Sequence, residues 1–133
     1  MNELNLESLR ERLPDPAKDL KLNLQAVLGE SSLTTAQKYG VALASAMASR
    51  STPLQDALAL ETRAQAGPEV EEDALAAAAL MGMNNVYYRF RHMVGRDSYD
   101  QLPARLRMNR LVRPAGSKLD FELFALAVSA ING

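Results

Sequence analysis

Apolar residues recur at steps of three and four along most of this chain, and this spacing restricts the fold more than any other feature of the sequence. One run extends from Pro68 to Gly95 and carries apolar side chains at Leu75, Ala79, Met83, Val86, Phe90 and Val94. Such spacing places apolar side chains on one face of an α-helix. No alternating pattern long enough for a β-strand accompanies it. The sequence therefore predicts an all-α fold.

Residues typical of helix starts divide the chain into separate helices. The predicted N-terminal caps are Asp15 before Pro16, Thr34 with Gln37, Thr52 with Gln55, Gly67 before Pro68, and Ser117 with Asp120. Together with the apolar spacing, they predict helices at 3–13, 16–28, 34–50, 53–66, 68–94, 103–112 and 118–131. Whether 97–102 is also helical stays open. The expected architecture is one helical domain, 1–133, of about six to seven helices.

Composition agrees with a helical domain of ordinary size. The 133 residues are 47% hydrophobic but only 5% aromatic, so small and aliphatic side chains must form the core. The formal net charge is −1, which favours neither a general polyanion-binding protein nor an acidic tail. No uncharged apolar run of membrane-spanning length and no basic-then-apolar leader is present. These features predict no membrane contact and a cytoplasmic location.

Four segments in order along the chain carry a resemblance to a known family. They are LPDPAKDLKLNL, MGMNNVYYRFRHMVG, RLRMNRLVRPAGSKLDFEL and AVSAING. With them the chain resembles the alkyl hydroperoxidase D (AhpD) family, which is related to carboxymuconolactone decarboxylases. The resemblance implies an antioxidant thiol-disulfide oxidoreductase that reduces alkyl hydroperoxides and regenerates a partner peroxiredoxin. It also implies a lipoyl-type dithiol reductant and a homo-oligomer. No Gly-rich phosphate loop or dinucleotide fingerprint is present in the sequence, so no bound cofactor is expected.

In that family a redox-active Cys-x-x-Cys pair follows the Asn-Gly that corresponds to Asn132-Gly133, and it starts the next helix. There is no cysteine in the 133 residues. We therefore expect the sequence to be truncated immediately before that motif, to lack the C-terminal redox helix and to be inactive by itself. The alternative is a catalytically inactive helical assembly or binding module on the same scaffold.

Glu122 is the candidate catalytic residue. It is the only charged residue between Phe121 and Ile131. On such an apolar helix a carboxylate should be desolvated, which favours its neutral form and suits it to proton transfer. The alternative is that Glu122 lies near the helix start, interacts with the helix dipole and points to water. The family glutamate corresponds to Glu122, so the resemblance favours the catalytic interpretation.

Other polar residues have weaker functional interpretations. His92 is the sole histidine and no metal-ligand spacing accompanies it, so a structural or surface role is expected, with a regulatory or substrate-contacting role as the alternative. Asn84 and Asn85 interrupt an apolar helix face and should form hydrogen bonds within the subunit, or brace the active-site helices or a subunit contact.

Arginines are concentrated in one part of the chain. Between residues 89 and 113 there are seven arginines against two acids. No nucleic-acid-binding motif accompanies them, so we predict that they pair with acidic helix starts and that nucleic acid is not a partner.

Overall fold

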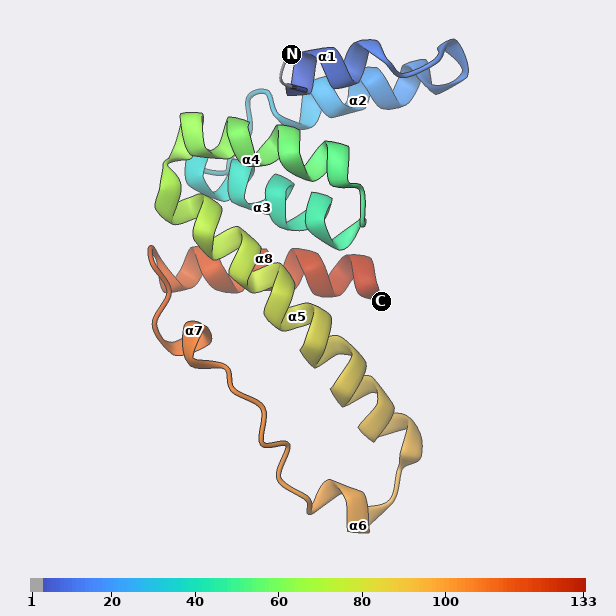
Figure 1. Cartoon of the computed structure of the whole chain (residues 1–133), viewed down its shortest axis with the longest axis vertical. Helices are drawn as coiled ribbons and strands as arrows, with labels where there is room; N and C mark the ends of the chain where they lie inside the picture. The colour runs from blue at the N-terminus through green and yellow to red at the C-terminus, as the bar shows by residue number, and fades with distance from the viewer. Residues whose placement is uncertain (1–3) are drawn as a thin grey trace.

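The protein is all-α, as predicted. A computed structural model describes residues 4–133, and its elements are α1 (Leu6–Glu11), the 3-10 turn η1 (Asp15–Ala17), α2 (Lys18–Val27), α3 (Thr35–Ala48), α4 (Thr52–Ala66), α5 (Pro68–Val94), α6 (Asp97–Asp100), α7 (Asn109–Val112) and α8 (Lys118–Asn132). Figure 1 shows α3, α4 and α8 side by side, with α5 crossing them. No helix among the described residues is long and apolar enough to cross a membrane.

The core lies where α3, α4, α5 and α8 meet. Leu43 of α3 and Phe121, Phe124 and Val128 of α8 are its largest fully buried apolar side chains. Small residues of α5, among them Ala74 and Ala77, are also fully buried, and they allow the α5 backbone to approach its neighbours closely. The aliphatic, aromatic-poor composition therefore produces closely packed helices.

Several predicted helix starts are confirmed. Thr34 and Gln37 form a reciprocal capping box at α3, and Ser117 accepts the backbone N–H of Asp120 at α8. Gly67 precedes Pro68 at the start of α5. The two capping side chains each accept a backbone N–H that a helix start leaves without a partner. Proline at the first helical position has no N–H that would need one.

Two predicted caps are wrong. The cap of α4 is Ser51, whose extended backbone places Thr52 already inside the helix, and no side chain bonds there. Asp15 is likewise the first residue of η1 rather than its cap, which is Pro14. In both places the chain turns into the helix one residue earlier than the side-chain pattern predicts.

The largest error concerns the predicted helix at 103–112. Only Asn109–Val112 is helical, and residues 103–108 have no regular structure. Arg105 has a φ of 54°, a left-handed value that an α-helix cannot contain. Of the segment 97–102, which the sequence left open, Asp97–Asp100 form the helix α6 and residues 101–102 lie after its end.

The N-terminal helices are shorter than predicted. Residue 3, the expected start of the helix at 3–13, lies outside the described residues, and α1 begins at Leu6 after a capping box between Asn5 and Ser8. The helix predicted at 16–28 is divided between η1 and α2.

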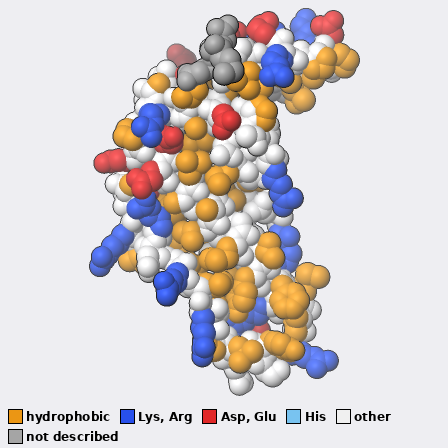
Figure 2. All heavy atoms as spheres, in the orientation of Figure 1, with side chains coloured by type: hydrophobic (Ala, Val, Ile, Leu, Met, Phe, Trp, Pro, Cys, Tyr) orange, Lys and Arg blue, Asp and Glu red, His pale blue; other side chains and the backbone are white. Residues whose placement is uncertain are grey.

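The second half of α5 projects beyond the packed helices, and α6 and the irregular segment after it return towards α7 (Figure 1). Large apolar side chains remain exposed along this projection, namely Val86, Phe90, Met93, Tyr99 and Leu102. Figure 2 shows hydrophobic side chains gathered over the lower part of this face. A contiguous exposed apolar surface of this kind is typical of a contact surface.

Candidate functional site at the end of the last helix

The carboxyl end of α8 is the place where the resemblance expects the reactive segment to begin. One side of α8 buries Phe121, Phe124 and Val128 in the core, which fixes the rotation of the helix about its axis. Its last turn then lies against α5, with Ser129 and Asn132 directed to that neighbour. The position and direction of the α8 end are therefore set by core packing.

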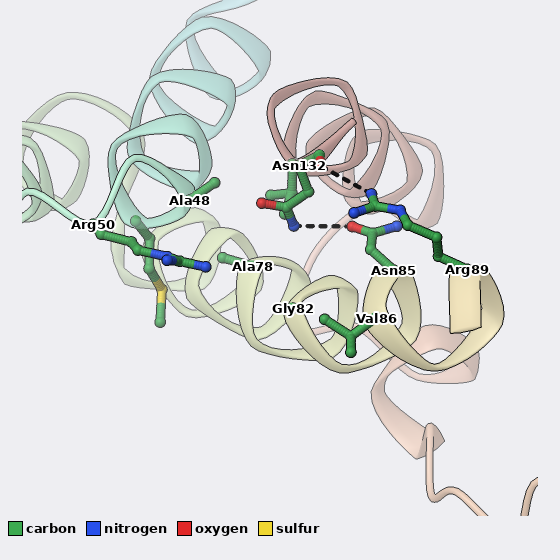
Figure 3. A pocket seen from close by; sticks show the side chains of 10 residues that line it. Ala48, Arg50, Ala78, Gly82, Asn85, Val86, Arg89 and Asn132 are labelled. Carbon is green, nitrogen blue, oxygen red and sulfur yellow. Dashed lines mark hydrogen bonds between the residues drawn. The ribbon is translucent and has the colours of Figure 1, made fainter. Parts of the chain in front are cut away.

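Asn85 joins α5 to this last turn. Its side-chain Nδ2 donates a hydrogen bond to the Ser129 hydroxyl at 3.0 Å, and its Oδ1 accepts one from Asn132 Nδ2, also at 3.0 Å. Figure 3 shows the Asn85–Asn132 contact between the two helices. Amides that bond across two helices satisfy both sets of polar atoms away from water. Asn85 thus braces the two helices, one of the interpretations the sequence offered.

Arg89 holds the backbone at the same end. Its Nη2 donates to the carbonyl oxygen of Asn132 at 2.8 Å and also to that of Gly133. The last carbonyls of an α-helix have no partner within the helix and carry its negative end, so a guanidinium there both pairs and neutralises them. Sequence analysis did not distinguish Arg89 from the other arginines. The sequence feature that could have identified Arg89 is its position one helical turn after Asn85, which places both side chains on the same face of α5.

Asn84 has a different role from its neighbour. Its side chain is 8% exposed, and its Nδ2 donates to the Met108 sulfur at 3.1 Å. Met108 lies in the irregular segment before α7, so Asn84 ties that segment to α5. Hydrogen bonding within the subunit is therefore confirmed for both asparagines.

Glu122 lies on α8 with an exposed side chain, so the predicted desolvation is wrong for the single chain. The apolar residues of the same helix do not shield it, since Leu119 and Leu126 are themselves 69% and 65% exposed. Glu122 precedes Ser129 by two turns on the same side of the helix, about 10 Å along the axis. It therefore lies on the same face of α8 as Ser129 but does not reach the contacts that Asn85 and Arg89 make with the end of this helix.

The other sequence candidates lie apart from this end. His92 is exposed near the end of α5, as expected of a surface histidine. Of the seven arginines between residues 89 and 113, two form ion pairs with described residues, so the predicted pairing is confirmed for only part of the set. Arg110 pairs with Glu72 in the N-terminal part of α5. Arg91 pairs with Asp100 at 3.4 Å. Within residues 4–133 no group of three or more His, Cys, Asp or Glu residues could hold a metal ion.

These features define a small all-helical protein whose candidate site is the braced carboxyl end of its last long helix. No protein-family model matches the chain. It is 66% identical over 128 residues to the alkyl hydroperoxide reductase AhpD of Anaeromyxobacter dehalogenans strain 2CP-C, a match covering 96% of this chain and 69% of that protein. It is 52% identical over 130 residues to AhpD of Gluconacetobacter diazotrophicus, covering 98% of this chain and 71% of that protein. It is 46% identical over 130 residues to AhpD of Brucella abortus, covering 98% of this chain and 74% of that protein.

The chain belongs to the alkyl hydroperoxide reductase AhpD family. Identities of this size across nearly the whole chain confirm the resemblance found in its four ordered segments.

Proposed function

We propose that this protein is an antioxidant alkyl hydroperoxide reductase, a thiol-disulfide oxidoreductase that reduces peroxides and regenerates a partner peroxiredoxin. The observation that carries the proposal is its 66% identity to a protein named for that activity, over 96% of this chain. The structure supports it because the end of α8 is held in a fixed position by Asn85 and Arg89 of α5.

The proposal requires a thiolate that these 133 residues do not contain. We propose that the natural protein continues from Gly133 into a Cys-x-x-Cys segment. The greater length of the relatives supports this, since the match covers 69% of the Anaeromyxobacter dehalogenans protein. One thiolate would attack the peroxide oxygen, cleave the O–O bond and release the alcohol. The resulting sulfenic acid would condense with the second thiol to a disulfide and water, and a lipoyl-type dithiol would reduce that disulfide.

Reading the coding sequence past Gly133 tests this part of the proposal. The proposed reading is Cys-x-x-Cys directly after Gly133. A stop codon or a cysteine-free continuation there would contradict it.

Glu122 is proposed to pass protons in this reaction. In the natural protein, Glu122→Gln is expected to lower peroxide turnover about 100-fold, because a positioned acid-base group contributes roughly 10² to 10⁴. Helical circular dichroism should be unchanged, since the side chain is exposed. Glu69→Gln is the matched control: Glu69 is an exposed glutamate in the first turn of α5, and its replacement should leave turnover unchanged. Equal turnover in the wild type and the Glu122→Gln variant would contradict the catalytic role and show that Glu122 only points to water and interacts with the helix dipole.

We further propose a homo-oligomer in the cytoplasm. The exposed Leu119 and Leu126 of α8, with the apolar projection of α5, provide surface for subunit contacts. The cytoplasm is proposed because dithiol-dependent chemistry needs a compartment in which thiols stay reduced.

A further inference from the structure

A cavity of about 220 Å³ opens between the end of α3, the middle of α5 and the end of α8 (Figure 3). Its polar side chains are Arg50, Asn85, Arg89 and Asn132. Apolar and small residues form the rest of the lining, including Met47, Val86 and Val128. The cavity therefore combines an apolar wall with two guanidinium groups, and no acidic side chain lines it.

The two arginines retain donors for a ligand. Arg50 forms no side-chain hydrogen bond or ion pair with any residue in the described part of the chain. Arg89 uses only Nη2 in its two bonds to the end of α8, which leaves Nε and Nη1. In Figure 3 the Arg50 side chain extends from the end of α3 towards α5, and Arg89 extends from α5 towards the end of α8. The cavity thus has two guanidinium groups and no carboxylate side chain in its lining, and one of the two, Arg89, also pairs with the carbonyl oxygens at the end of α8.

Arg50 also has an unfavourable backbone conformation. It follows α3 with a φ of 62°, in the left-handed region where glycine is the usual residue after a helix. The fold alone would accept glycine here at lower conformational cost. A long cationic side chain held in that conformation at the edge of a cavity is the kind of local strain found at functional sites.

We propose that this cavity binds a small aliphatic carboxylate, with its head group between Arg50 and Arg89 and its hydrocarbon chain against Met47 and Val86. A guanidinium fork matches the two oxygens of a carboxylate. The apolar wall favours an attached hydrocarbon over a bare anion, and the volume, below that of a drug-sized pocket, restricts its length. The cavity shares Asn85, Arg89 and Asn132 with the braced end of α8, but the proposed binding does not rest on the peroxide chemistry, because it needs no thiol.

Calorimetric titration of the 133-residue chain with hexanoate and with acetate tests the proposal. Hexanoate should bind at least about tenfold more tightly, since burying two of its additional methylenes suffices for that ratio. Arg50→Gly should weaken hexanoate binding about tenfold while leaving thermal unfolding at the same or a higher temperature, because it removes one charged contact and relieves the left-handed backbone.

Arg105→Gly is the matched control, because Arg105 also has a positive φ, 54°, but does not line the cavity. It should gain stability in the same way and bind hexanoate like the wild type. Arg50→Asn provides a second uncharged variant that tolerates the same backbone, should Arg50→Gly unfold. Hexanoate binding no tighter than that of acetate or inorganic phosphate, or full hexanoate affinity in a folded Arg50 variant, would overturn the proposal.

Discussion

Replacing Gly40 with alanine is expected to destabilise the fold by about 3 kcal/mol, the upper part of the range for overpacking a core. Gly40 is buried on α3, and a Cβ built there would lie 2.1 Å from Cζ of Phe124, far inside van der Waals contact. Phe124 is itself 1% exposed and is surrounded by the core, so its ring has no free space to move into. Urea denaturation followed by circular dichroism measures the loss.

Gly82→Ala is the matched control for this change. Gly82 is also a helix-interior glycine, in α5, but apart from its chain neighbours and the adjoining α5 backbone no atom lies within 4 Å of the Cβ that alanine would add. Alanine should therefore stabilise the chain, by up to about 1 kcal/mol, through its higher helix propensity. Equal stability of the Gly40→Ala variant and the wild type would show that α3 and α8 do not pack as described.

Replacing Asp73 with asparagine is expected to lower the free energy of unfolding by about 3 kcal/mol. Asp73 is 1% exposed, and its two carboxylate oxygens each accept a backbone N–H, from Ala115 and Gly116, both at 2.7 Å. Asparagine has one acceptor oxygen, so its NH₂ group would face one of these N–H donors, and a buried donor would lose its partner. Denaturant unfolding gives the loss, and amide exchange of Ala115 and Gly116 locates it.

Asp56→Asn is the control, because Asp56 is exposed on α4 and no side-chain bond to it is formed by the described residues. Its effect should stay within about 0.5 kcal/mol. If Asp73→Asn were as mild, the segment before α8 would be held by something other than the Asp73 carboxylate.

Most of the helical architecture was predictable from local sequence. Apolar spacing and helix-start residues together identified α3, α4, α5 and α8, because a buried helix face must repeat with the helical period and a helix start needs a cap. Two predicted caps with this three-residue spacing, Thr34 with Gln37 and Ser117 with Asp120, are present, whereas Thr52 with Gln55 is not. The helix expected at 103–112 failed because the left-handed backbone at Arg105 has no sequence signal, since arginine seldom adopts it.

The site was less predictable, because its contacts join residues far apart in the chain. Arg89 and the Asn132 carbonyl are 43 positions apart, and Asn85 and Ser129 are 44 apart. Such pairs depend on where α5 crosses α8, which composition and periodicity do not specify. The exposure of Glu122 was mispredicted for a related reason: an apolar helix is not buried all round when only one of its faces meets the core.

Peroxide-dependent oxidation of a dithiol tests the proposed function most directly. The natural protein expressed from the full coding sequence would be mixed with dihydrolipoamide and an alkyl hydroperoxide, with the 133-residue chain as the thiol-free control. We predict that the natural protein consumes hydroperoxide and dithiol in equal amounts, while the 133-residue chain gives only the uncatalysed rate. Consumption by the natural protein no faster than that uncatalysed rate would contradict the account and favour a helical assembly without redox activity.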